Sequence, residues 1–206
     1  MLKRLFDLWA SSLGLLLLAP LLLALAIAIK LDSPGPVFFR QVRVGRHGVE
    51  FRIHKFRTMA HRDTAVDAAT AQLTVGPDPR ITHVGALLRR TKLDELAQLI
   101  DVVVGRMSLV GPRPEVPCYV ALYPQPLRDK VLSVRPGITD PASLAFRDES
   151  ARLARAADPE REYVEVLLPV KLQLSARYVD EASFMGDLRL IAATLRVLWL
   201  RGRGGA

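Results

Sequence analysis

The chain opens with an unbroken apolar run from Leu8 to Ile29, which holds 22 residues without a charged side chain. A helix of this length, at about 1.5 Å per residue, covers roughly 33 Å, and the hydrocarbon core of a bilayer is about 30 Å thick. Ala19 and Pro20 lie near the middle of the run. Because proline removes one helical hydrogen bond, the pattern predicts a membrane helix with a break at these two residues.

The charges on either side of the run predict how this helix enters a membrane. Lys3 and Arg4 precede the run, and four more bases lie between residues 30 and 46. The positive-inside rule places both flanks on the cytoplasmic face, which a helix that enters and leaves through one face satisfies and a straight spanning helix does not. A cleaved signal peptide is a further alternative, but the run exceeds the core of about 7 to 15 residues typical of signals. We expect a re-entrant membrane helix over residues 1–31, followed by a cytoplasmic-face domain over residues 32–206.

Alternating β-type residues follow the apolar run. The stretches 37–44 and 49–56 flank Gly45-Arg46-His47-Gly48, which predicts a β-hairpin. Bases and phenylalanines interleave along both stretches. These bases fit a solvated sheet face, a surface that meets anionic lipid, or a cluster that binds oxyanions. The polar segment 60–82, which carries Pro77-Asp-Pro79, predicts a surface loop.

Helical periodicity resumes after residue 82 and predicts two successive helices, with Thr91 as a cap between them and the second helix running from Leu93 to Gly105. Asp94 and Glu95 then share the first turn of the second helix. Acids in a first turn interact favourably with the helix dipole by about 0.3 to 1 kcal/mol, which is a sufficient reason for their presence. Two adjacent carboxylates can also hold Mg²⁺ together with water and substrate phosphates.

Two turns that combine proline, glycine and arginine follow, at Gly111-Pro-Arg-Pro114 and Arg135-Pro-Gly-Ile-Thr139. Proline stiffens the backbone beside each arginine, and a guanidinium suits bidentate contacts with phosphate. Residues 148–181 have a helical period with breaks predicted at Pro159 and Pro169. Residues 186–200 fit either an amphipathic helix at a membrane interface or a buried packing helix. The architecture expected is mixed α and β and mainly helical, with a small hairpin and interfacial helices.

Composition narrows the classes of partner. Half of the residues are hydrophobic and the mean hydropathy is +0.19, which excludes a disordered chain. The formal net charge is +8, and nine bases against three acids fall in the first 60 residues. Because these bases adjoin the apolar run, we expect anionic lipid rather than nucleic acid as the partner. A single cysteine, Cys118, excludes an intramolecular disulfide.

Six motifs follow the apolar helix in a fixed order: Gly35-Pro-Val-Phe-Phe-Arg-Gln41, Lys55-Phe-Arg-Thr-Met59, Asp78-Pro-Arg-Ile-Thr82, Leu93-Asp-Glu-Leu96, Met107-Ser-Leu-Val-Gly-Pro-Arg-Pro114 and Arg135-Pro-Gly-Ile-Thr139. By these motifs the chain resembles the bacterial sugar transferase family, the small monotopic phosphoglycosyl transferases, over nearly its whole length. The resemblance implies transfer of a phospho-sugar from a UDP-sugar to a polyprenol phosphate such as undecaprenyl phosphate. UMP is released, in a first membrane step of glycoconjugate assembly.

The resemblance also implies roles for particular residues. Asp94 is implied as the nucleophile that forms an acyl-phosphate, with Glu95 as its acidic partner, and both as residues that help to hold Mg²⁺. The implied phosphate-binding bases are Lys55, Arg57, Arg89, Arg113 and Arg135. Membrane lipids are implied as partners and a homodimer is an option, with the site on the cytoplasmic face of the bacterial inner membrane. A non-enzymatic scaffold, whose basic hairpin binds anionic lipid and whose acids only cap a helix, is the alternative function.

Overall fold

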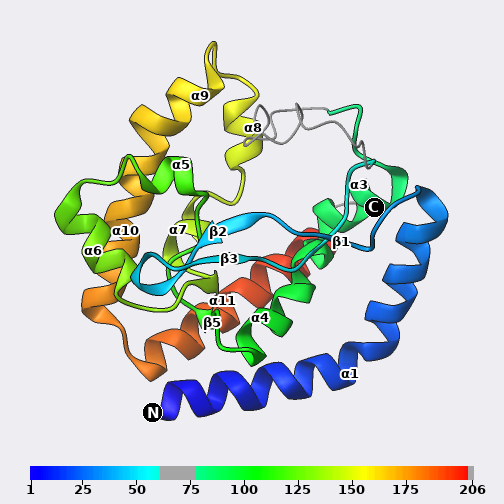
Figure 1. Ribbon diagram of the computed structural model, residues 1–206, viewed down its shortest axis with the longest axis horizontal. Coiled ribbons are helices and arrows are strands. Elements are labelled where there is room, and N and C mark those ends of the chain that lie inside the picture. The colour runs from blue at the N-terminus through cyan, green and yellow to red at the C-terminus, as the bar shows by residue number, and fades with distance from the viewer. Residues whose placement is uncertain (61–77, 204–206) are drawn as a thin grey trace.

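The structure is a computed structural model that describes residues 1–60 and 78–203, with side chains described as far as residue 198. The described chain is mainly helical and contains three small sheets of two strands each (Figure 1). This confirms the mixed and mainly helical architecture predicted from the sequence. Most of the predicted loop over residues 60–82 lies outside the described residues.

The apolar run forms a single helix, α1 (Leu2–Asp32), that contains Pro20. Figure 1 shows α1 running along one edge of the molecule and then turning sharply away from its first direction. The helix continues through the turn, so the expected break takes the form of a kink. The most apolar 18-residue window of α1 has a mean hydropathy of 2.6 and is only 11% buried. Helix α1 is therefore long and apolar enough to cross a membrane.

Both ends of α1 are attached to the same folded body. Near the start of α1, Arg4 donates to the carbonyl oxygen of Val102 at 2.8 Å, on α4 (Leu99–Val103). At its end, the Asp32 carboxylate accepts from the backbone N–H of Val84 at 3.0 Å, in the first turn of α3 (His83–Thr91). The kink thus lies between two fixed ends.

The predicted β-hairpin is present but interrupted. Its outer pair is β1 (Phe38–Phe39) with β4 (Lys55–Phe56), its inner pair is β2 (Val42–Val44) with β3 (Glu50–Arg52), and the turn is the short 3₁₀ helix η1 (Arg46–Gly48). Both pairs are antiparallel. The ladder is interrupted before β4, where the backbone N–H of His54 donates to the carboxylate of Asp101 on α4 rather than to a strand.

The two arginine-bearing turns lie side by side because the strands that meet them pair in parallel. Strand β5 (Ser108–Val110) precedes the first turn, and β6 (Gly137–Thr139) emerges from the second. Glycine is required where the backbones meet, since a Cβ atom built on Gly137 lies 2.1 Å from the backbone nitrogen of Gly111. The pairing brings residues 111–114 and 135–139 together from separate parts of the sequence.

Of the helices that follow β5, α11 (Phe184–Arg203) packs against both strands of this small sheet. The others are α5 (Pro117–Val120), α6 (Gln125–Leu132), α7 (Pro141–Ala145), α8 (Glu149–Leu153), α9 (Pro159–Arg161), the π-helical η3 (Glu162–Leu167) and α10 (Leu168–Glu181). Pro159 begins α9 as predicted, but the break predicted at Pro169 is wrong. Helix α10 follows directly from the π-helical η3 and contains Pro169, so the chain stays helical through this proline.

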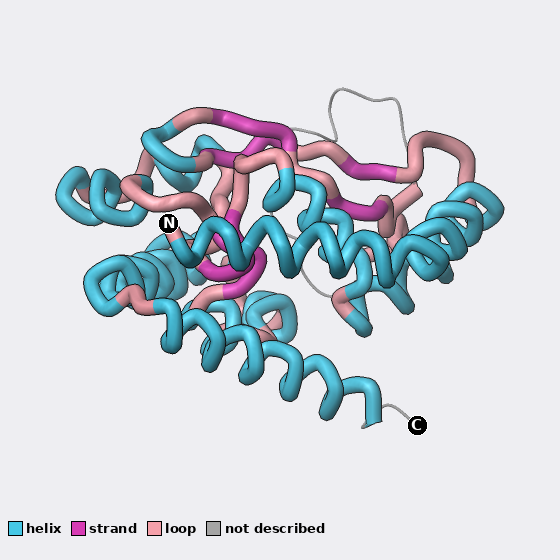
Figure 2. The backbone as a smooth tube through the Cα atoms, turned by 90° about the horizontal axis from the view of Figure 1, so that it is seen from below, coloured by secondary structure: helices cyan, strands magenta, loops and turns pink. Residues whose placement is uncertain are grey.

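Helix α11 packs partly against the body and leaves part of its surface exposed; its position at a membrane interface stays a prediction. Asp187 is buried against the body, whereas Leu195 on the same helix is 61% exposed. In Figure 2, α11 runs to the C-terminus on one side of α1, and the strands of the hairpin lie on the other side. One side of α11 therefore packs inward, and its exposed side mixes Met185 and Leu195 with Arg189 and Arg196.

A cluster of buried side chains connects α1 to the helices that follow the hairpin. Ile29 of α1 packs with Phe56 of β4, Leu88 of α3 and Ala97 of the 3₁₀ helix η2 (Leu93–Gln98). Each of these four residues is at most 2% exposed. The end of the apolar helix thus supports the segment that carries Asp94 and Glu95.

Candidate active site

The acidic pair follows a sharp turn between α3 and η2. Lys92 adopts the left-handed conformation with φ of 59° and ends α3, and η2 begins at the next residue. The capping role predicted for Thr91 is wrong, because its hydroxyl donates back to the carbonyl of Leu87 at 2.8 Å. Asp94 and Glu95 nevertheless lie in the first turn of a helix, as predicted, although this turn is 3₁₀ rather than α.

The Asp94 carboxylate is buried and only half satisfied. The residue is 1% exposed, and its Oδ2 atom forms an ion pair with Nζ of Lys55 at 2.8 Å. Its Oδ1 atom is buried and has no hydrogen-bond partner within the described part of the chain. A buried acceptor without a hydrogen bond lowers the stability of a fold by about 1 to 3 kcal/mol. The unpartnered Oδ1 atom therefore needs a reason other than stability. Oδ1 is the atom that is free to meet a cation or a reacting group.

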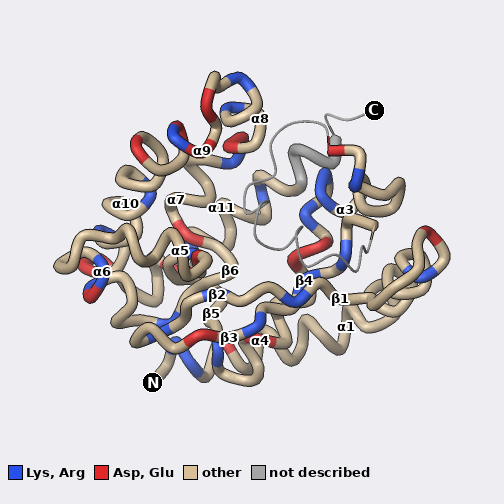
Figure 3. The backbone as a smooth tube through the Cα atoms, turned by 45° about the horizontal axis from the view of Figure 1, so that its top comes forward, with Lys and Arg blue, Asp and Glu red and all other residues tan. Residues whose placement is uncertain are grey.

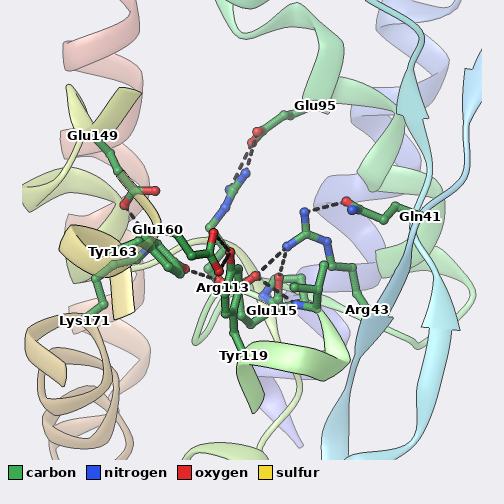
Figure 4. Close-up of polar contacts among 12 residues, drawn as sticks. Gln41, Arg43, Glu95, Arg113, Glu115, Tyr119, Glu149, Glu160, Tyr163 and Lys171 are labelled. Carbon is green, nitrogen blue, oxygen red and sulfur yellow. Dashed lines mark hydrogen bonds and ion pairs between the residues drawn. The ribbon is translucent and has the colours of Figure 1, made fainter. Parts of the chain in front are cut away.

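Glu95 is held in its ionised form by two bases. Its two carboxylate oxygens accept from Arg113 at 2.6 and 3.1 Å, and Nζ of Lys55 lies 3.6 Å away. Burial by itself raises the pKa of the Glu95 carboxyl, but the charges of Arg113 and Lys55 outweigh it and lower this pKa well below its usual range. Figure 4 shows the Glu95 carboxylate and the Arg113 guanidinium facing each other.

The backbone beside Arg113 is held from two directions. On one side, the N–H of Arg113 points to the carboxylate of Asp140 at 3.4 Å. On the other side, Arg43 of β2 donates to the carbonyl of Pro114 at 3.1 Å and to the Glu115 carboxylate at 3.0 Å (Figure 4). The stiff turn predicted from its prolines is thus braced by three charged side chains that the sequence did not identify as site residues.

Tyr163 connects this turn to the helices beyond it. Its hydroxyl donates to the Glu115 carboxylate at 2.5 Å, and Nζ of Lys171 lies 4.8 Å from the centre of its ring (Figure 4). Glu115 directly follows the Gly-Pro-Arg-Pro motif, and this position is the signal by which sequence reasoning could have found it.

The other predicted bases lie in different surroundings. Arg89 donates from Nε to the Thr58 hydroxyl at 2.9 Å; burial lowers the pKa of its guanidinium, and the charge of Asp94 opposes that effect. Arg57 closes the end of α1 by donating to three carbonyl groups, those of Ile29, Ser33 and Pro34.

Arg135 donates from Nε to the carbonyl of Gly105 at 2.9 Å. The structure therefore brings Lys55 and Arg113 into contact with the acidic pair, and it places Arg89 close enough to interact electrostatically with Asp94. Substrate contacts of Arg57 and Arg135 stay predictions.

The charge distribution around the acidic pair favours an anionic ligand. Figure 3 shows acidic positions after α3 that lie among basic positions of α3 and β4. Within residues 1–60 and 78–203, no group of three His, Cys, Asp or Glu side chains could form a metal site. Mg²⁺ does not require such a group, because it takes one or two carboxylates and completes its shell with water and substrate phosphates. Asp94 fits this requirement through its unpartnered Oδ1 atom, and Glu95 is the adjacent carboxylate, although both of its oxygens accept from Arg113.

Comparison with known proteins places the chain in a family. A family model described as bacterial sugar transferase matches residues 1–201. The chain is 39% identical to the exopolysaccharide production protein PSS of Rhizobium leguminosarum bv. phaseoli, over 98% of both chains. It is 48% identical to the undecaprenyl-phosphate glucose phosphotransferase of Komagataeibacter xylinus, over 94% of this chain and 35% of that protein.

It is also 38% identical to the UDP-glucose:undecaprenyl-phosphate glucose-1-phosphate transferase of Escherichia coli K12, over 95% of this chain and 39% of that protein. The chain thus spans nearly all of the Rhizobium protein but less than half of the other two.

Proposed function

Because this chain belongs to the bacterial sugar transferase family, we propose that it transfers a phospho-sugar from a UDP-sugar to undecaprenyl phosphate and releases UMP. The names of the Escherichia and Komagataeibacter relatives support this reaction, and that of the Rhizobium relative supports a place in exopolysaccharide assembly. The observation that carries the proposal is the buried Asp94 carboxylate, which Lys55 holds through one oxygen while the other is unpartnered.

The reaction proceeds in two halves through one aspartate. In the first half, Oδ1 of Asp94 attacks the phosphorus linked to the sugar, a new P–O bond forms, and the P–O bond to UMP breaks. In the second half, a phosphate oxygen of the lipid attacks the same phosphorus, and the Asp94 carboxylate leaves. Dividing the transfer lets a soluble donor and a membrane-bound acceptor use the same site in turn. Ping-pong kinetics follow.

The neighbouring bases orient the reacting groups. Lys55 fixes Oδ2 of Asp94 and so determines where Oδ1 lies. Glu95 binds Arg113 through two hydrogen bonds, and the Arg113 side chain is still 38% exposed. Because a guanidinium has five N–H donors, Arg113 can meet a substrate phosphate while Glu95 holds its orientation. Fixed donors of this kind stabilise the charge that develops during phosphoryl transfer.

Mg²⁺ is the cofactor that this arrangement fits, with Asp94 and Glu95 as the residues that would hold it. When bound, Mg²⁺ supplies positive charge to the phosphate oxygens of the donor. We expect EDTA to abolish UMP release from the purified protein and added Mg²⁺ to restore it, as followed by a coupled UMP assay. Full activity in the presence of EDTA would contradict the role of a divalent cation.

The attachment of α1 supports a re-entrant position in the membrane. Its two ends are tied to one body through Arg4 and Asp32, so a kinked helix that enters and leaves through one face keeps both ties. The site then lies at the level of the lipid headgroups, where undecaprenyl phosphate presents its phosphate. We place it on the cytoplasmic face of the inner membrane, where UDP-sugars are made, with residues 1–31 as the membrane unit.

A panel assay tests the reaction and its specificity together. Protein in lipid nanodiscs is incubated with undecaprenyl phosphate and each of several UDP-sugars, and UMP is measured. We expect release with one sugar or a few closely related sugars, and an undecaprenyl diphospho-sugar product. Salt-sensitive binding to anionic liposomes without UMP release from any donor would instead support a non-enzymatic scaffold.

A substitution of Arg57 tests whether this residue has a structural role or binds the substrate. It is 5% exposed and its contacts are with carbonyls at the end of α1, so Arg57→Lys should lower the unfolding free energy by about 1 to 3 kcal/mol. The KM for the UDP-sugar should stay within about twofold, since none of those contacts faces the acidic pair. Thermal unfolding and steady-state kinetics measure the two effects, with exposed Arg52→Lys as the control. A raised KM at unchanged stability would assign Arg57 to the substrate.

A further inference from the structure

A second buried carboxylate lies two helical turns beyond Asp94. Asp101 of α4 is 0% exposed, and a single residue occupies both of its oxygens. The Oδ1 atom is 2.8 Å from Nδ1 of His54, and Oδ2 accepts from the backbone N–H of His54 at 2.7 Å. Asp101 thus fixes both the ring and the backbone of the residue that precedes Lys55.

The contacts of the His54 ring define its tautomer. Nη1 of Arg40 lies 2.7 Å from Nε2 of His54, and Nη2 of Arg40 donates to the carbonyl of Arg52 at 3.0 Å. A guanidinium can only donate, so Nε2 accepts and the ring proton is on Nδ1, where it is donated to Asp101. Residues 52–54 are therefore held by Arg40 from one side and by Asp101 from the other.

Each of the two buried aspartates contacts one of two consecutive residues, His54 and Lys55. Asp94 and Asp101 are seven positions apart along η2 and α4, and they contact Lys55 and His54 respectively. The short segment that carries Lys55 is thus tied at two points to the helical segment that carries the proposed nucleophile. A displacement of His54 would move Lys55 relative to Asp94.

We propose that Asp101, acting through His54, is a positioning residue that sets Lys55 against Oδ2 of Asp94 and so presents Oδ1 to the donor phosphate. The inference rests on the proposed function and adds two residues to its machinery. Neither touches the reacting atoms. Their effect is expected on the rate of the first half-reaction, because small misplacements of a reacting group slow its attack strongly.

Substitutions of His54 can separate its ring contact with Asp101 from its ring contact with Arg40. In His54→Asn, the amide nitrogen occupies the position of Nδ1 and can still donate to Asp101. In His54→Gln, the amide reaches the position of Nε2 instead, so the bond to Asp101 is lost while that to Arg40 is kept. Asp101→Asn removes the charge and one acceptor without changing the shape.

The measurement is single-turnover labelling of the full-length protein in nanodiscs by a UDP-sugar that carries label in its sugar phosphate. We expect Asp101→Asn and His54→Gln to lower the labelling rate about tenfold, and His54→Asn to stay within about threefold of wild type. The KM for the donor and the labelled fraction at completion should not change. In a Lys55→Met background, Asp101→Asn should have little further effect, because residues that act through one another are not additive.

Each outcome decides between the alternatives. A lower labelled fraction at an unchanged rate would show a purely structural role for Asp101 and overturn the proposal. Unchanged rates in Asp101→Asn and His54→Gln would overturn it as well, and effects that add fully to that of Lys55→Met would exclude a route through Lys55. Wild-type protein that neither takes up label nor releases UMP would refute the proposed function, and this inference with it.

Discussion

Asp94→Asn is expected to abolish covalent labelling and to lower UMP release by about four orders of magnitude, because an amide cannot replace a carboxylate as the nucleophile. Asn has nearly the same shape as Asp and fits the same buried position, so the fold should be retained. The loss should therefore appear in the rate at an unchanged amount of folded protein. Mass spectrometry of the trapped intermediate in wild-type protein should locate the phospho-sugar on Asp94.

The matched control for this variant is Asp129→Asn, which changes an exposed carboxylate on α6 in the same way. It should retain wild-type activity. An Asp94→Asn protein that still accepts label would exclude Asp94 as the nucleophile. Initial-rate patterns that require donor and acceptor to bind together would exclude the two-step scheme, whichever residue is labelled.

Gly137→Ala is expected to have the largest effect on stability. The added Cβ atom lies 2.1 Å from the nitrogen and 2.5 Å from the oxygen of Gly111, so strands β5 and β6 must separate. Two backbone hydrogen bonds depend on their approach, from Gly137 N–H to Pro112 at 3.0 Å and from Gly111 N–H to Thr139 at 3.1 Å. Because backbone atoms cannot move aside as side chains do, we expect a loss of about 3 kcal/mol or more in unfolding free energy.

The loss can be measured by thermal unfolding in detergent and by the yield of folded protein. Gly14→Ala is the control, since its added Cβ meets only a side-chain atom, Cδ1 of Leu99, at 3.4 Å. A Gly137→Ala protein that is as stable as Gly14→Ala would show that the parallel pair does not require this close approach.

Features that depend on neighbouring residues were predictable from the sequence. The length of α1, the bend in a helix that contains Pro20, the hairpin around residues 45–48 and the acidic pair in a first helical turn follow from local periodicity and turn chemistry. Two predictions from local patterns, the Thr91 cap and the break at Pro169, were wrong because the chain adopts another local structure at each place. Thr91 bonds to the preceding turn of its own helix, and a π-helical segment leads into α10 ahead of Pro169.

Pairings between distant residues could not be read from the sequence. Glu95 and Arg113 are 18 positions apart, and His54 and Asp101 are 47 apart. Arg57 and Arg135 resemble Arg113 as bases in motifs, yet their side chains bind carbonyls elsewhere. Only packing determines which of several similar side chains reaches a given site.

The residue types of the site, the apolar helix beside it and the family to which the chain belongs can all be read from the amino-acid sequence. These depend on short-range patterns that a few neighbouring residues define. Packing of distant segments is needed to bury Asp94 with one oxygen unpartnered, to bring Lys55 and Arg113 to the acidic pair, and to join Asp101 to His54. Burial and ion pairing arise when segments far apart in the chain pack together, and a pattern of neighbouring residues does not specify which distant segments meet.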